Sequence, residues 1–144
     1  MIIAIRISGL VEVPEKTQET LFRLRLRRKY SAVLLKPTPE NLKLLRKIRN
    51  YIAYGDINNQ TLVLLLENRA RSNEKKKMNS KVIAGQLENK PNEPNKLLQS
   101  IGIKPFFRLH PPRNGIDSKI HFPIKKGVLG DNKEKINDLV RRMI

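Results

Sequence analysis

The 144-residue sequence contains no cysteine, no tryptophan and few acidic residues. Without cysteine, the chain can form neither disulfides nor thiolate metal sites, and it has no cysteine nucleophile, which is compatible with an intracellular protein. The longest apolar run, around residues 61–66, is far shorter than the roughly 20 residues that span a bilayer. The first residues are isoleucine-rich and lack the basic start of a secretory signal, so we expect a strand there. Redox chemistry and membrane insertion are therefore excluded.

Positive charge dominates what remains. Thirty Lys and Arg stand against thirteen Asp and Glu, which leaves a formal net charge of +17. A folded chain seldom carries such self-repulsion unless a polyanion neutralises it. Nucleic acid is the expected partner. A membrane surface could also accept this charge, but the many arginines favour nucleic acid because their planar forks bind phosphate oxygens and stack on bases.

The hydrophobic pattern of the first 58 residues alternates between two periods. Strands are predicted at residues 2–8, 31–36 and 51–57, with helices from Pro14 to Arg28 and from the Thr38-Pro39 start onward. Ile3, Ile5 and Ile7 should point to the core. This order predicts an α+β fold with a ferredoxin-like β-α-β-α-β core, in which helices cover one face of a small sheet.

The second half of the chain, residues 59–144, is predicted to be an extension packed on the same domain. We expect helices over residues 60–71, 97–101 and 131–143, the last begun by an Asp131 and Glu134 capping box. A strand is expected at 105–109, and Gly55 with Asp56 should form a bulge or turn. Residues 72–95 are rich in Lys, Asn, Glu and Pro and predict a loosely ordered linker.

The densest basic segment runs from residue 21 to residue 49. It holds ten Lys and Arg against the single acid Glu40. A basic helix face that is merely solvated usually carries compensating Glu one turn away, and this one does not. The segment is therefore interpreted as RNA-binding, with the solvated face as the alternative.

A second basic segment, residues 108–131, is rich in proline and glycine. The Pro111-Pro112 pair fixes backbone angles, and glycines allow tight turns, so basic side chains would be presented to RNA at little entropic cost. The alternative is a surface loop that only caps the sheet. From both segments the candidate RNA-binding residues are Arg23, Arg25, Arg27, Arg28, Lys29, Lys43, Arg46, Lys47, Arg49, Arg108, His110, Arg113, Lys119, His121, Lys125 and Lys126.

An enzyme is not expected. His110 and His121 have no third ligand in a metal spacing, and neither a Gly-x-Ser-x-Gly motif nor a phosphate-binding loop is present. We therefore predict no catalytic residue, metal, cofactor or small-molecule substrate. A helix-turn-helix with Asn or Gln readers is also missing, which favours recognition of RNA shape over readout of DNA bases.

Two segments resemble a known family. The stretch "TLFRLRLRRKYSAVLLKPTPENLKLLRKIRNYIAYGD" (20–56) resembles the core of the large-subunit ribosomal protein family called L-thirty in bacteria and L-seven in eukaryotes. The stretch "FRLHPPRNGIDSKIHFPIKKGVLGDNKEKINDLVRRM" (107–143) is similar to the extension of its archaeal and eukaryotic members. Together they cover about half of the chain, in the right order.

The resemblance implies an antiparallel three-stranded sheet in the order 3-1-2. It further implies a structural component of the large subunit of the cytoplasmic ribosome, bound to ribosomal RNA and neighbouring ribosomal proteins, with an archaeal source. A contact with the small 5S RNA is left open. The alternative is a basic RNA- or DNA-binding module outside the ribosome.

The family's RNA-facing residues map onto particular positions of this sequence. Its basic stretch falls on Arg25, Arg27, Arg28 and Lys29 and on the helix start at residues 38–39. Its Pro-Pro-Arg-x-Gly loop falls on residues 111–115. Asn114 departs from relatives that often carry a second glycine there, but Asn tolerates a positive φ, so we expect the turn to be kept.

Overall fold

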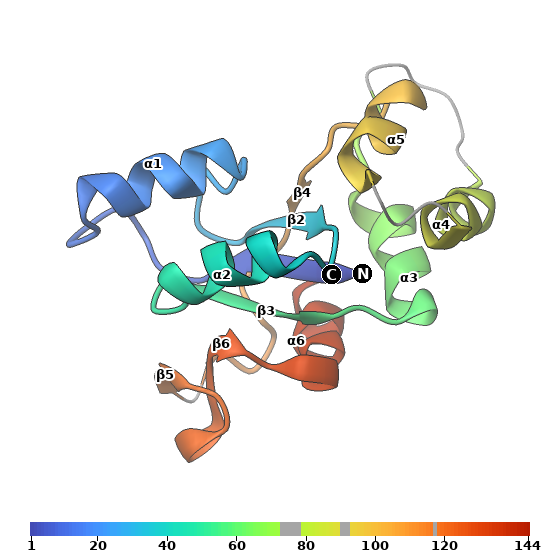
Figure 1. Ribbon diagram of the computed structural model, residues 1–144. Coiled ribbons are helices and arrows are strands. Elements are labelled where there is room, and N and C mark those ends of the chain that lie inside the picture. The colour runs from blue at the N-terminus through green and yellow to red at the C-terminus, as the bar shows by residue number, and fades with distance from the viewer. Residues whose placement is uncertain (73–78, 90–92, 117) are drawn as a thin grey trace.

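The computed structural model describes residues 1–72, 79–89, 93–116 and 118–144. The strands are β1 (Ile2–Arg6), β2 (Ser31–Leu35), β3 (Ile52–Asp56), β4 (Phe107–Arg108), β5 (Ser118–His121) and β6 (Gly127–Asp131). The helices are α1 (Glu15–Arg23), α2 (Pro39–Lys47), α3 (Asn59–Arg69), α4 (Ser80–Asn89), α5 (Pro94–Ser100) and α6 (Ile136–Met143), with short 3-10 helices η1 (Ile124–Lys126) and η2 (Lys133–Lys135). Figure 1 shows the mixed α+β fold that the sequence predicts.

The sheet has six strands in the order β4-β2-β1-β3-β6-β5. Strand β1 pairs antiparallel with β2 and β3, and β4 pairs antiparallel with β2, so the predicted additional strand is confirmed. Strand β6 joins β3 in parallel, and β5 joins β6 in parallel. The predicted three-stranded antiparallel sheet in the order 3-1-2 is therefore corrected to a mixed sheet of six strands. Strands β5 and β6 lie in a segment whose prolines and glycines predicted a loop, although Val128 and Leu129 are buried there.

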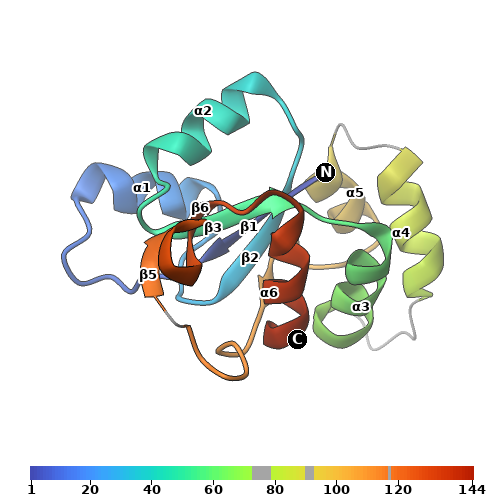
Figure 2. The same ribbon diagram turned by 90° about the horizontal axis from the view of Figure 1, so that it is seen from below.

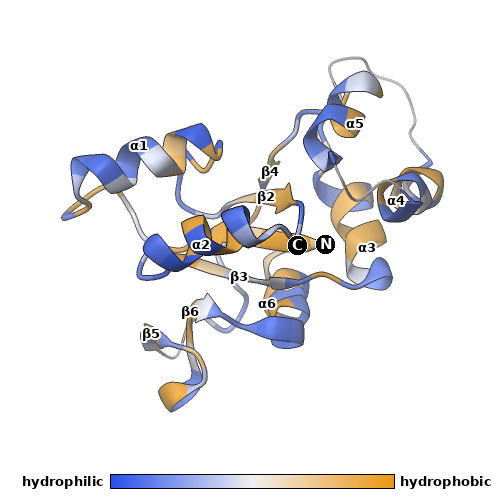
Figure 3. Ribbon diagram, viewed as in Figure 1, coloured by the Kyte–Doolittle hydropathy of each residue, from blue (hydrophilic) through white to orange (hydrophobic). Residues whose placement is uncertain are grey.

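Helices cover both faces of the sheet, not one as predicted. Figure 2 shows α1 and α2 on one face and α3 and α6 on the other. The reason is the composition of β1, where Ile2 and Ala4 pack in the cluster with α1 and α2 while Ile3 and Ile5 pack in the cluster with α3 and α6. Figure 3 shows the central strands and α3 as hydrophobic and most of α1 as hydrophilic.

Helix α1 is shorter than the predicted helix that continued to Arg28. It ends at Arg23, because Arg25 adopts a left-handed conformation with φ of 63°. The amide of Leu26 donates to the carbonyl of Leu21 (2.8 Å), and the amide of Arg25 donates to that of Phe22 (2.9 Å). These two bonds form a Schellman motif, and the accompanying hydrophobic contact is supplied by the fully buried Leu21 and Leu26.

Gly55 forms no bulge or turn, which corrects the prediction. It is a regular residue of β3, paired with Ile3 of β1. A Cβ atom there would lie 2.2 Å from the backbone oxygen of Lys133. Glycine is therefore required at this position by the close approach of η2, and not by a turn.

The predicted linker at residues 72–95 contains a helix. In α4, Ile83, Ala84 and Leu87 are buried in the same core cluster as the α3 residues Leu62, Leu65 and Leu66. Three small or aliphatic residues at helical spacing are thus enough to dock an otherwise polar segment. The predicted linker also overlaps the start of α5 at Pro94, and its residues 73–78 and 90–92 lie outside the described residues.

The last helix begins later than predicted. The predicted capping box is wrong, since Asp131 ends β6 and its carboxylate accepts from the amide of Lys133 (3.0 Å). Helix α6 starts at Ile136, with Ile136, Leu139, Val140 and Met143 buried as expected.

The predicted start of α2 at Thr38-Pro39 is confirmed. Thr38 caps α2 by accepting from the amide of Asn41 (3.3 Å), with Pro39 in the first turn.

Among the described residues, no helix is both long and apolar enough to cross a membrane. The division of the chain after residue 58 stays a prediction. The fold is compatible with a ferredoxin-like plan.

Candidate nucleic-acid interface

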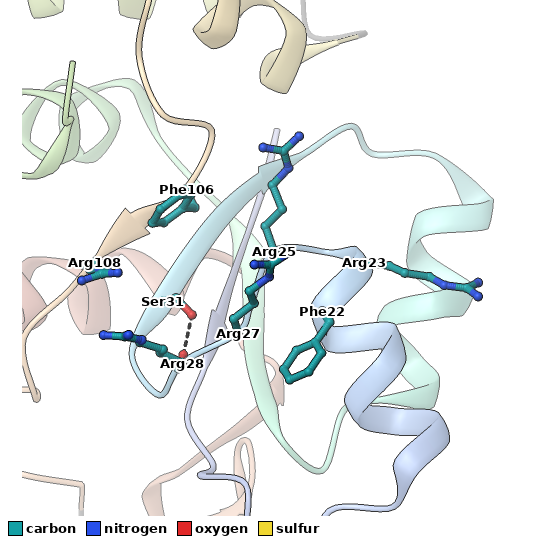
Figure 4. Close-up of a pocket in the computed structure, with 8 residues that line it drawn as sticks. All are labelled: Phe22, Arg23, Arg25, Arg27, Arg28, Ser31, Phe106 and Arg108. Atoms are coloured by element: carbon teal, nitrogen blue, oxygen red, sulfur yellow. Dashed lines mark hydrogen bonds between the residues drawn. The ribbon is translucent and has the colours of Figure 1, made fainter. Parts of the chain in front are cut away.

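A groove of about 580 Å³ opens between the carboxyl end of α1 and the edge strand β4 (Figure 4). Its lining consists of Phe22, Arg23, Arg25, Arg27, Arg28, Ser31, Phe106 and Arg108. Five of these side chains are arginines and none is acidic. Cations gathered in one concave surface without a carboxylate repel one another, and the arrangement is favourable only when an anion enters. We refer to it as the arginine groove.

The Schellman motif of α1 places the first arginines of this groove. Because Leu21 and Leu26 are anchored in the core, the chain between them reverses direction with Arg25 exposed at its tip. When its amide oxygen faces the guanidinium, Gln99 of α5 accepts from Arg25 at 3.0 and 3.3 Å. Arg25 therefore extends toward α5 on one side of the groove, as Figure 4 shows.

Arg6 fixes the loop that carries Arg27 and Arg28. Its side chain is fully buried in β1, and its guanidinium donates to the carbonyl of Leu26 at 2.9 Å and to that of Arg27 at 3.1 Å. Two further bonds reach the carbonyls of Ser8 (2.9 Å) and Gly9 (2.8 Å). Burial lowers the pKa of the Arg6 guanidinium from its ordinary value. The guanidinium therefore connects the loop that carries Arg27 and Arg28 to the loop that follows β1.

Arg6 is buried together with the four apolar residues of β1. A fork of five donors matches several converging carbonyls, and it can be buried when those acceptors replace water.

Strands β2 and β4 form the other wall of the groove. Ser31 pairs with Arg108 across the two strands, and the Ser31 hydroxyl donates to the carbonyl of Arg28. Arg28, in the loop that precedes β2, and Arg108 of β4 therefore lie on the same side of the groove (Figure 4). Among the described residues neither makes an ion pair, which leaves both guanidiniums available to an anion.

Arg23 contributes less than the other groove arginines. It forms an exposed ion pair with Glu19 one turn earlier on α1 (2.5 Å), and Figure 4 shows its guanidinium directed away from the other arginines. We therefore restrict the term groove arginines to Arg25, Arg27, Arg28 and Arg108.

The other predicted basic residues of the first segment lie outside the groove. Lys43, Arg46 and Lys47 are exposed on α2, and Arg49 is exposed in the turn after it. Lys29 lies over the Tyr30 ring, 4.9 Å from its centre. All of these side chains are exposed, and none of them lines the arginine groove.

The proline loop after β4 is held against the end of α6. The amide of His110 donates to the carbonyl of Met143 (2.9 Å), and that of Arg113 donates to the carbonyl of Arg142 (2.9 Å). Asn114 and Gly115 are both left-handed, with φ of 64° and 70°, so the expected tolerance of Asn114 is confirmed. The exposed His110 and Arg113 are thus presented from an anchored turn.

The remaining candidates lie at the opposite edge of the sheet. Lys119 and His121 belong to β5, and Lys125 and Lys126 belong to η1, beyond β6. Since β4 and β5 are the two outermost strands, Arg108 and these four residues lie at opposite edges of the sheet. The sequence treated residues 108–131 as one loop, and the structure divides them into two regions.

Metal binding finds no support in the described residues, where no group of three His, Cys, Asp or Glu side chains could hold an ion. Sequence reasoning missed four residues of the groove region: Arg6, Phe22, Ser31 and Phe106. The sequence offered one signal, which is Phe22 directly before the arginine-rich residues 23–28. Basic residues interleaved with aromatic residues are typical of RNA contact surfaces.

Comparisons with known proteins identify the family of the chain. A family model described as Ribosomal protein L30p/L7e matches residues 2–52. The large ribosomal subunit protein uL30 of Archaeoglobus fulgidus is 36% identical over 157 aligned residues, covering 99% of each chain. The uL30 proteins of Nanoarchaeum equitans (36% over 151 residues, 96% of each chain) and Methanoregula boonei (32% over 153 residues, 99% of each) are also similar. The chain therefore belongs to the L30p/L7e family of ribosomal proteins, in its archaeal type.

Proposed function

We propose that the protein is a structural constituent of the large ribosomal subunit of the cytoplasmic ribosome and that it binds ribosomal RNA through the arginine groove. The observation that carries the proposal is the groove itself, whose lining includes the four groove arginines and no carboxylate. The family of the chain, which is one of ribosomal proteins, supports ribosomal RNA as the ligand. As a member of this family, the chain is a structural component and not an enzyme.

The groove arginines would bind phosphates specifically, because the Schellman motif, the Arg6 bonds and the β2–β4 pairing fix their backbone. Arg113 would act similarly from its anchored turn. The exposed residues of α2 and the cluster on β5 and η1 would add attraction that depends on charge more than on geometry. In this assignment residues 1–58 form the ribosomal core and residues 59–144 form an extension packed on the same domain.

The two basic regions at opposite sheet edges suggest that the protein bridges separate RNA segments. One of these could be supplied by 5S RNA, and neighbouring ribosomal proteins would contact the less charged surfaces. The alternative function is a basic RNA- or DNA-binding module outside the ribosome, which the same positive charge would allow.

Sedimentation of cell extracts from the source organism tests the proposal. We expect the protein in the large-subunit fraction and its release only at high salt, because phosphate contacts displace counterions. Arg28→Glu should release at lower salt than Lys81→Glu, which makes the same change in charge at an exposed position on α4. Recovery with chromatin or membranes, or equal release of both variants, would contradict the proposal.

A further inference from the structure

Phe22 is an unusual residue for a solvent-facing position. Its side chain is 42% exposed, and it is the one aromatic residue among the exposed large hydrophobic side chains of the described chain. It lies on the last turn of α1 at the border of the arginine groove, with the half-buried Phe106 on the opposite side (Figure 4). Two of the chain's four phenylalanines therefore border the arginine groove.

An RNA duplex would leave these rings without a partner. Its bases are stacked inside, and its surface offers phosphates and hydroxyl groups, which satisfy arginines but not a phenyl ring. An unpaired nucleotide offers both features, since its base has a π face and its phosphates carry charge. The volume of about 580 Å³ falls in the range of cavities that hold small-molecule ligands.

We propose that the arginine groove binds an unpaired RNA nucleotide, whose base stacks on the Phe22 ring while the groove arginines hold the adjacent phosphates. This inference rests on the proposed function and adds the class of RNA that the groove recognises. An acidic peptide would satisfy the arginines, but it has no planar group for the ring.

The local structure favours such stacking. Phe22 belongs to the rigid end of α1, because its carbonyl accepts from the amide of Arg25 and closes the helix. The backbones of Phe22 and Arg25 are thus fixed by the same motif, which reduces the entropy lost on binding.

Filter binding of the full chain to two RNAs at about 0.15 M salt tests the proposal. The probes are a single-stranded 12-nucleotide RNA of mixed adenine and uracil and a 12-base-pair RNA duplex. We expect Phe22→Leu to weaken binding of the single strand about 5- to 150-fold, which corresponds to about 1 to 3 kcal/mol for one stacked base, and to change duplex binding less than about twofold. Phe22→Tyr should retain the affinity for the single strand.

Val82→Ala serves as the matched control, because Val82 is an exposed apolar residue (56%) on α4, outside the groove lining. It should leave both affinities unchanged. Equal loss on both RNAs, or no loss on the single strand, would overturn the inference while leaving RNA binding itself intact. Competition by a 12-residue polyglutamate peptide at the concentration at which the single strand competes would favour a peptide partner instead. If the unaltered chain bound neither RNA, the proposed function would fail as well.

Discussion

Replacing Arg6 with methionine should both destabilise the protein and weaken RNA binding. The guanidinium makes four hydrogen bonds, to the carbonyls of Ser8, Gly9, Leu26 and Arg27, and its side chain is fully buried. Methionine fills a similar volume but donates none of these bonds. The loop that carries the groove arginines would lose its main attachment to β1.

The magnitude follows from these partners. The bond to the Leu26 carbonyl is buried, so removing its donor costs about 1 to 3 kcal/mol for the unsatisfied acceptor. The other three bonds are partly buried, and water can replace their donor, at a net cost near 0.5 to 1 kcal/mol each. Part of this loss is offset, because methionine carries no charge and so avoids the cost of burying one. The same cost of burial lowers the pKa of Arg6. We expect a loss of about 2 to 4 kcal/mol in the free energy of unfolding.

Urea unfolding followed by circular dichroism measures the stability, and filter binding below the unfolding transition measures RNA affinity. The stability and RNA affinity of Arg6→Lys should lie between those of the unaltered protein and of Arg6→Met, because an ammonium keeps the charge but cannot span carbonyls on both loops. Leu87→Ala is the control, because Leu87 is a fully buried residue of α4 outside the groove lining. Its truncation should lower the free energy of unfolding by about 2 to 5 kcal/mol, a loss similar to that of Arg6→Met. The reasoning would be refuted if Arg6→Met lost less than about 1 kcal/mol, or if it bound RNA as well as Leu87→Ala does.

Two further substitutions test other parts of the structure. Gly55→Ala should destabilise the protein by more than about 2 kcal/mol in urea unfolding, because its Cβ would lie 2.2 Å from a backbone oxygen. Gly85→Ala on α4 should instead be neutral or stabilising by up to about 1 kcal/mol, because an added Cβ would have no atom within 4 Å outside its own helix backbone. Equal stability changes for the two alanine variants would contradict the close approach of η2 to Gly55. Arg25→Gly should relieve the left-handed strain and raise stability by up to about 1 kcal/mol while lowering the salt slope of RNA binding by about one; an unchanged slope would exclude Arg25 from phosphate contact.

Much of the fold could be predicted because the first three strands and α2, α3 and α6 follow simple periodicities. The Thr38-Pro39 cap and the apolar stripe of α6 are local signals that packing did not override. The end of α1 could not be predicted, because arginine is rarely left-handed. At the corresponding position after α5, Gly102 (φ of 83°) is the ordinary residue for such a turn, and its sequence signal was clear.

The basic surface was predictable in composition but not in arrangement. All the predicted cations except His121, which is half-buried, are exposed, as charge density indicates. That Arg108 joins residues 25–28 in one groove depends on the pairing of β4 with β2, a contact between residues more than seventy positions apart. Sequence spacing carries no information about such a contact. It equally could not separate Arg108 from Lys125 on the opposite edge of the sheet.

Ultraviolet cross-linking of intact large ribosomal subunits from the source organism, followed by mass spectrometry of the RNA-bound peptides, tests the central claim most directly. We predict that ribosomal RNA is attached to peptides within residues 22–31 and 106–113, which carry the groove. Attachment confined to peptides of α3 and α4, or no attachment to this chain in a subunit that contains it, would contradict the assignment of the arginine groove as the RNA-binding site.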